Sequence, residues 1–173
     1  NWVGQHEGLY NAYLSLKNSP EFATYSVAQK KAIENALRDF ELSGIGLSEE
    51  KQKRYGEIVA RLSELSAQFS NNVLDATMGW EKVIEDESEL AGLPESALLA
   101  AKQSAESKGL KGYRFTLEIP SYLPIMTYCE NAALREEMYR AYATRASDQG
   151  PNAGKWDNTA IIEEIMTLRV ELA

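Results

Sequence analysis

The pair His6-Glu7 is the sequence feature that comes nearest to a catalytic pattern. In zinc peptidases with a His-Glu-x-x-His helix, two histidines one turn apart bind the metal and the glutamate activates a water molecule. Here Tyr10 stands where the second histidine is needed, and His6 is the only histidine of the chain, so no site within it can have two imidazole ligands. We therefore expect His6 to be a solvent-facing or hydrogen-bonded residue without a catalytic role.

The segment Gly150-Pro-Asn-Ala-Gly154-Lys155 resembles a phosphate-binding loop, in which backbone N–H groups and a lysine surround the phosphates. It departs from that pattern, because three residues instead of four separate the glycines and Trp156 replaces the Ser or Thr that ligates Mg²⁺. No strand is predicted before it either. We expect a turn-rich connection between two helices, with contact to a partner as the lesser alternative.

Carboxylates occur in two groups that invite a metal-binding interpretation. The first group, in the segment 85–89, lacks the glycine and the alternating spacing of an EF-hand calcium loop, so it is expected to be a solvated turn. The second group consists of four glutamates on the last two predicted helices. It lacks the Glu-x-x-His pairs of a carboxylate-bridged metal site in a helix bundle, so these glutamates are expected to lie on ion-paired outer faces. The groups are Glu85, Asp86, Glu87 and Glu89, and Glu136, Glu137, Glu163 and Glu164.

One cysteine and several aromatic residues complete the candidates. Cys129 has no histidine partner to activate it, which predicts a small core residue. The aromatic residues of the last third are expected to pack in the core, with a peptide-facing wall as the lesser alternative. They are Tyr122, Tyr128, Tyr139, Tyr142 and Trp156. The residues alone thus predict no catalytic and no metal-binding residue in this chain, and they leave any substrate-binding residues unknown.

Charge and cysteine content restrict the function classes. The chain has 26 acidic and 18 basic residues, a net charge of −8, which argues against nucleic acid as a partner because nucleic acid is bound mainly by clustered Lys and Arg. One cysteine allows no internal disulfide, and no stretch approaches the roughly 18 apolar residues of a membrane span. We expect a cytoplasmic protein without a membrane partner.

The first half of the chain is predicted to be helical. A helix is expected over about residues 5–17, and a second one follows Ser26, which forms a capping-box signature with Gln29. The strongest periodicity runs over about residues 48–78, where apolar residues recur every three or four positions. At about 1.5 Å per residue this helix is roughly 45 Å long, which suits either a piece of a larger helical body or a coiled-coil dimer.

The second half contains the one strong strand candidate. Residues 113–117 alternate between apolar and polar, and the strand would pair with Val83-Ile84, with a second copy of the chain or with missing sequence. Further helices are expected over about residues 95–107, 121–128, 131–145 and 158–173. The last of these carries Ile161, Ile162, Ile165 and Leu168 on one stripe.

The predicted fold class is mostly α. It is a multi-helix chain with one long helix (about 48–78) and at most a minor strand or hairpin (about 80–84 and 112–118). Both ends of the sequence look cut, because residue 1 is Asn rather than Met and the last helix reaches Ala173 without a Gly, Asn or Pro stop signal. We expect residues 1–173 to be a single helical fragment of a longer protein.

Five runs of sequence together resemble the thimet oligopeptidase family of zinc metallopeptidases. The likeness covers essentially the whole chain, and the loop Ser-Asp-Gln-Gly-Pro-Asn at 147–152 is its most distinctive part. The runs are LRDFELSGIGL (37–47), RLSELSAQFSNNVLDAT (61–77), ELAGLPESAL (89–98), EIPSYLPIMTYCENAALREEMYRAY (118–142) and RASDQGPNAGKWDN (145–158).

The resemblance implies a cytoplasmic, zinc-dependent endopeptidase that cleaves short peptides within a deep channel of an almost wholly helical body. In that family a His-Glu-x-x-His helix and a downstream Glu hold the zinc, and no position of this sequence matches them. The resemblance thus implies that residues 1–173 form channel wall in the non-catalytic N-terminal part, while the missing catalytic half of the same chain binds zinc and cleaves short peptides. The alternative is a free-standing helical module that dimerises through the long helix.

Overall fold

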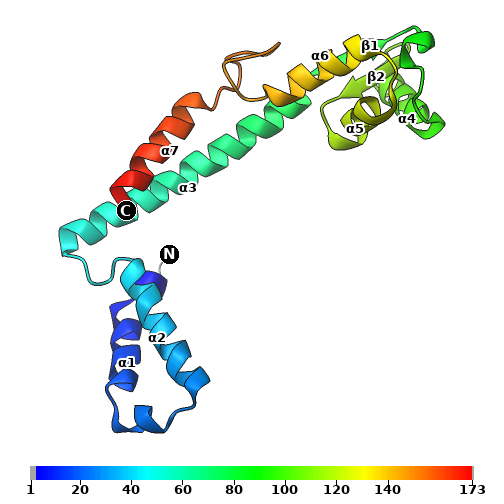
Figure 1. Ribbon diagram of the computed structural model, residues 1–173. Helices are drawn as coiled ribbons and strands as arrows, with labels where there is room; N and C mark the ends of the chain where they lie inside the picture. The colour runs from blue at the N-terminus through cyan, green and yellow to red at the C-terminus, as the bar shows by residue number, and fades with distance from the viewer. Residues whose placement is uncertain (1–2, 173) are drawn as a thin grey trace. The chain divides into compact units, whose positions relative to one another are not determined.

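The computed structural model describes residues 3–172 and is mostly helical within that range (Figure 1). The mostly α fold class is confirmed. The α-helices are α1 (Glu7–Lys17), α2 (Val27–Leu42), α3 (Glu49–Met78), α4 (Glu95–Glu106), α5 (Ile119–Tyr128), α6 (Ala132–Ala143) and α7 (Thr159–Leu172). The strands are β1 (Glu81–Ile84) and β2 (Tyr113–Thr116), and short 3-10 helices occupy Val3–Gln5, Pro20–Thr24 and Glu87–Leu90. None of the described helices is both long enough and apolar enough to cross a lipid bilayer.

The described residues divide into two compact units, which comprise residues 3–62 and 63–171. Helix α3 contributes its first half to one unit and its second half to the other. The larger unit contains the hairpin, α4 to α7 and the loop before α7. The expectation that the chain is a single helical piece of a longer protein stays a prediction.

In the first unit, α1 and α2 contact each other and bury the apolar side of α2. The capping box at the start of α2 is confirmed: the Gln29 N–H donates to Ser26 Oγ over 3.3 Å, and the Ser26 N–H donates to Gln29 Oε1 over 2.9 Å. The ring of the buried Phe40 has its centroid 5.8 Å from that of Tyr10 and 6.0 Å from that of Tyr13. Aromatic packing of this kind joins the two helices.

Helix α3 is continuous over 30 residues and confirms the long helix predicted for 48–78. Its first turn carries Glu49 and Glu50, which favour a helix start because carboxylates stabilise the positive N-terminal end of the helix dipole. Ile58, Leu65 and Ala76 are buried along it, as their spacing predicts.

The predicted strand pairs within the chain, so one of the three partners open to it is confirmed. Strands β1 and β2 are antiparallel, with Glu81 opposite Thr116 and Ile84 opposite Tyr113. Arg114 crosses the hairpin: its Nε lies 2.6 Å from Glu81 Oε2, and its Nη1 donates to Ser104 Oγ on α4 over 2.9 Å. The hairpin is therefore joined to α4 by a side-chain hydrogen bond as well as by apolar packing in the core.

The core of the second unit lies between the hairpin, α4, α5 and α6 (Figure 1). Cys129 belongs to it, which confirms the expectation that this cysteine is a small core residue. The core residues are Trp80, Ile84, Leu90, Leu93, Ala101, Phe115, Leu117, Ile125, Cys129, Leu134, Met138 and Ala141.

Two details concern the starts of α5 and α6. Helix α5 begins at Ile119 rather than at residue 121, because Pro120 lies in its first turn, where the missing N–H has no partner to lose. Arg135 in the first turn of α6 is half-buried and donates from Nη1 to the carbonyl of Cys129, which lies just before that helix. A guanidinium on a long stem can satisfy a backbone oxygen in this way while its stem packs.

Helix α7 does not carry its four apolar residues on one buried stripe. Ile161 is 7% exposed, and Ile165 and Leu168 are half-buried, but Ile162 is 44% exposed. Consecutive residues of an α-helix point about 100° apart, so Ile161 and Ile162 cannot share a narrow stripe. The prediction is wrong for Ile162.

Candidate functional site

His6 has a structural role at the start of α1. Its backbone is extended, with φ −86° and ψ 93°, and its Nδ1 accepts the Leu9 N–H over 3.1 Å, so His6 is the N-cap of the helix. This contact satisfies one of the backbone donors left without a partner at a helix start. It also moves the first helical residue to Glu7, two positions later than the sequence predicts.

The acidic turn 85–89 is an exposed cap. Asp86 Oδ1 accepts the Ser88 N–H over 2.9 Å at the start of the 3-10 helix Glu87–Leu90, and this hydrogen bonding to Ser88 lowers the pKa of Asp86. Glu87 accepts a hydrogen bond from the Tyr113 hydroxyl, which raises the pKa of Tyr113. Both carboxylates thus have partners within the chain.

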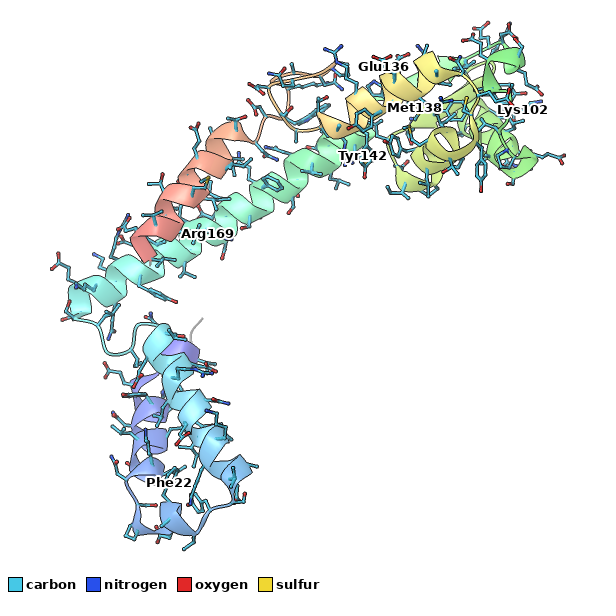
Figure 2. The ribbon with its side chains drawn as sticks, in the orientation of Figure 1. Phe22, Lys102, Glu136, Met138, Tyr142 and Arg169 are labelled. Atoms are coloured by element: carbon cyan, nitrogen blue, oxygen red, sulfur yellow. The ribbon has the colours of Figure 1, made fainter. Side chains whose placement is uncertain are left out.

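Among residues 3–172, no three His, Cys, Asp or Glu side chains come together in an arrangement that can hold a metal ion. Glu137 of the second acidic group pairs with Lys82, with Nζ 2.8 Å from Oε2. Glu136 lies on the outer side of α6, away from Met138 and the core (Figure 2). The donor set of the described residues therefore does not fit a zinc site.

The loop 144–158 between α6 and α7 is folded on itself by short-range hydrogen bonds. Ser147 Oγ donates to the Thr144 carbonyl over 2.8 Å, and the Gly154 N–H donates to the Ser147 carbonyl over 3.0 Å. Gly150 has φ +82°, and a Cβ there would lie 1.9 Å from Thr144 Oγ1, so glycine is required at this position.

The backbone of the loop 144–158 does not have the arrangement of a phosphate-binding loop. The N–H groups of Ala153 and Lys155 donate to the carbonyls of Gly150 and Asn152, over 3.2 and 3.1 Å. They are therefore engaged within the loop, and the segment that precedes the loop is α6 rather than a strand. The structure confirms the predicted turn-rich connection between two helices.

Asn158 fastens the end of this loop to α3. It is 2% exposed; its Oδ1 accepts from Asn72 Nδ2 over 2.8 Å, and its Nδ2 donates to the Phe69 carbonyl over 3.2 Å. The Asn158 N–H also donates to the Ala146 carbonyl over 3.0 Å, which closes the loop. Trp156 adds a packing contact, since a Cβ on Gly79 would lie 2.0 Å from its ring.

Replacing Asn158 with alanine is expected to lower the free energy of unfolding by about 1–3 kcal/mol, because it removes the two partly buried hydrogen bonds of the Asn158 side chain to Asn72 and to the Phe69 carbonyl. Urea unfolding followed by circular dichroism measures the change. The control is Asn71→Ala, an exposed position on α3 next to Asn72, expected within about 0.5 kcal/mol of the parent. Equal values for the two variants would show that Asn158 does not anchor the loop.

A layered stack joins α5, α6 and the loop. The rings of Tyr122 and Tyr142 are stacked with centroids 4.2 Å apart and an interplanar angle of 16°. The Arg145 guanidinium lies 3.6 Å from the Tyr142 ring centroid, and its Nη1 donates to Thr77 Oγ1 over 2.8 Å. Burial, followed by the neighbouring tyrosines, raises the pKa of Tyr122. Figure 2 shows Tyr142 on the side of α6 opposite Glu136.

The aromatic residues divide between packing and exposure. Tyr122, Tyr142 and Trp156 are half-buried in the contacts just described. Tyr128 and Tyr139 are 54% and 59% exposed, so the expectation of core packing is wrong for these two. They leave aromatic surface open to solvent, which core residues do not.

The outer side of α6 and the loop together border an open hollow of about 510 Å³. Trp80 forms part of it, and Glu136, Glu137 and Arg140 supply charges of both signs. Gly150 and Pro151 complete it from the loop. We call α6 with the loop 144–158 the α6-loop wall. Within the described residues it presents a hollow, an exposed tyrosine and charges of both signs.

Known proteins are similar to this chain along almost its whole length. Residues 1–52 match the family described as Neurolysin/Thimet oligopeptidase, N-terminal domain. Oligopeptidase A of Haemophilus influenzae is 87% identical over 172 residues, and oligopeptidase A of Escherichia coli is 72% identical over 172 residues. A probable cytosolic oligopeptidase A of Arabidopsis thaliana is 43% identical over 178 residues.

Each of these alignments covers 99% of this chain but 25% of the relative, so the chain spans about a quarter of the length of the curated relatives it matches. The Asn158 anchor and the α6-loop wall lie within the aligned length. By its sequence, the chain is similar over almost its whole length to a quarter of oligopeptidase A, and its first 52 residues match the thimet oligopeptidase N-terminal domain.

Proposed function

We propose that residues 1–173 are a non-catalytic helical part of a zinc-dependent oligopeptidase, an endopeptidase that hydrolyses short peptides in the cytoplasm. The observation that carries the proposal is the 87% identity over 172 residues to oligopeptidase A of Haemophilus influenzae. Because that match covers 25% of the relative, the activity is assigned to a longer polypeptide that includes this chain.

Zinc is assigned to the part of that polypeptide outside residues 1–173. The donor set of the described residues does not fit the metal, and the sequence has one histidine. When bound in such an enzyme, zinc supplies an activated water that attacks the peptide carbonyl. The residues of this chain would act before that step, by limiting which peptides reach the metal.

The α6-loop wall is the surface we assign to that role. Helices and a hydrogen-bonded loop hold their shape, so a channel wall built from them admits flexible chains and excludes folded proteins. Exposed Tyr139 on α6 gives a peptide an aromatic surface to pack against, and Arg140 and Glu136 give it charges of both signs. The wall contributes selection by size rather than by a single specificity pocket.

The cytoplasmic location is part of the same proposal. It is supported by the name of the Arabidopsis relative, a probable cytosolic oligopeptidase A. The only cysteine, Cys129, is buried and free, which suits a reducing compartment.

Peptide hydrolysis tests the proposal. Residues 1–173 alone are expected to hydrolyse no fluorogenic peptide and to retain no stoichiometric zinc after dialysis, whereas the full polypeptide encoded by the gene hydrolyses the peptide and loses activity with a chelator. Activity of residues 1–173 that a chelator abolishes would contradict the assignment of zinc, and a full polypeptide without peptidase activity would contradict the function itself.

A further inference from the structure

Helix α7 carries apolar residues on two separate sides. One side contains the buried Ile161 and the half-buried Ile165 and Leu168. The other contains Ile162, Met166 and Val170, which are 44%, 64% and 77% exposed. These three residues follow one another at intervals of four, so they form one stripe along the helix, which we call the α7 stripe.

The α7 stripe has the composition of a packed helix face. A helix on a protein surface shows one apolar side and one polar side, whereas a helix that is apolar around more of its circumference is typical of the interior of a larger body. The stripe has a polar border, since Glu163 and Arg169 are exposed on its two sides. Apolar rows with polar borders mark contact surfaces on proteins.

The first apolar side of α7 has its neighbour in the described structure. Asn158, directly before the helix, bonds to Asn72 and to the Phe69 carbonyl, and α7 starts beside α3 at that point (Figure 1). Ile161 follows within one turn and is 7% exposed. The α7 stripe is on a different side of the helix and is exposed to solvent within residues 3–172.

We propose that the α7 stripe is an internal interface on which another part of the same longer polypeptide packs. The inference rests on the proposed function, because it requires that longer polypeptide. Relatives that align with 99% of this chain extend it about fourfold, since the chain covers 25% of each. Most of the protein surface that can cover α7 therefore lies outside residues 1–173.

The chemistry of the α7 stripe indicates what covers it. Ile162, Met166 and Val170 present no hydrogen-bonding group, so they need an apolar partner such as the apolar side of a second helix. A ridge of residues spaced by four fits the groove between equivalent ridges of another helix, and this is the commonest helix packing in globular proteins. A second copy of the chain is disfavoured, because each copy has a net charge of −8 and the two would repel.

Thiol labelling in the full polypeptide tests the inference. Met166→Cys places a thiol on the stripe, and the matched control Thr167→Cys places one at the next position of the same helix, which is also exposed in residues 3–172. Each rate of maleimide labelling, read by mass spectrometry at the peptide that contains the introduced thiol, is divided by its rate in urea, where both thiols are accessible. Val170→Cys is a second stripe probe in case Met166→Cys fails to fold.

The expected result is that the thiol of the Met166→Cys variant is labelled at least about tenfold more slowly than that of the Thr167→Cys variant, independently of protein concentration, because a covered thiol reacts only when the structure opens. Equal normalised rates would overturn the inference, and so would protection that increases with protein concentration, which assigns the stripe to a second copy. Peptidase activity of the same unmodified polypeptide is measured separately, so a failure of the interface and a failure of the proposed function remain distinguishable.

Discussion

Replacing Phe115 with alanine is expected to destabilise the second unit by about 3–5 kcal/mol, because it removes a large ring from a packed core and leaves a cavity. Phe115 is 2% exposed on β2 and belongs to the main hydrophobic cluster. The loss acts on the hairpin and on the helices packed against it, since α4 and α5 both contact β2. Urea unfolding followed by circular dichroism measures the free energy.

The matched control is Leu123→Ala on α5. Leu123 is 55% exposed, so its truncation removes little buried surface and is expected to change the free energy of unfolding by less than about 1 kcal/mol. A loss for Phe115→Ala as small as that of the control would mean that the cluster around β2 does not hold the second unit together.

Gly112→Ala is the second large expected effect, with a loss of about 2–5 kcal/mol. Gly112 precedes β2 and has φ +86°, a conformation that costs a residue with a side chain about 1–2 kcal/mol. In addition, a Cβ at this position would lie 2.3 Å from the Ile84 carbonyl oxygen. That oxygen is backbone at the end of β1 and moves only if the hairpin shifts. The measurement is again the free energy of unfolding in urea.

Gly109→Ala separates the two contributions. Gly109 also has a positive φ, +69°, but a Cβ there would meet nothing within 4 Å. Its replacement is expected to cost only the backbone strain, about 1–2 kcal/mol. If Gly112→Ala costs no more than Gly109→Ala, the close approach to the Ile84 carbonyl does not constrain the sequence.

Local signals predicted the helices well. The capping box of Ser26 and Gln29 fixes the start of α2 through backbone contacts three residues apart, and this geometry follows from sequence alone. The long apolar periodicity of α3 has the same local origin. Strand pairing was less determined, because a strand of four residues specifies no partner until the chain around it has folded.

Exposure was harder to predict than secondary structure. Tyr128, Tyr139 and Ile162 are apolar enough for a core, and nothing in a single sequence says which side of a helix meets the next element. For Ile162 the spacing itself carried a warning, since its neighbour Ile161 already occupies the buried side of α7. For the two tyrosines, exposure depends on tertiary structure alone.

The main anchor of the candidate site was missed for a similar reason. Asn158 bonds to residues 86 and 89 positions away, and an asparagine before a helix has many other uses in a sequence. Gly79 gave no signal either, because its need for a small side chain comes from Trp156, far along the chain. Long-range hydrogen bonds and close approaches of this kind are set by the fold and not by local pattern.

The reading frame of the gene beyond Ala173 tests the central claim most directly. If the chain is a non-catalytic part of a zinc peptidase, the frame continues well beyond Ala173, since the chain covers 25% of its relative, and contains a His-Glu-x-x-His motif followed by a further Glu. A stop codon directly after Ala173, or a continuation without that motif, would contradict the claim and favour a free-standing helical module.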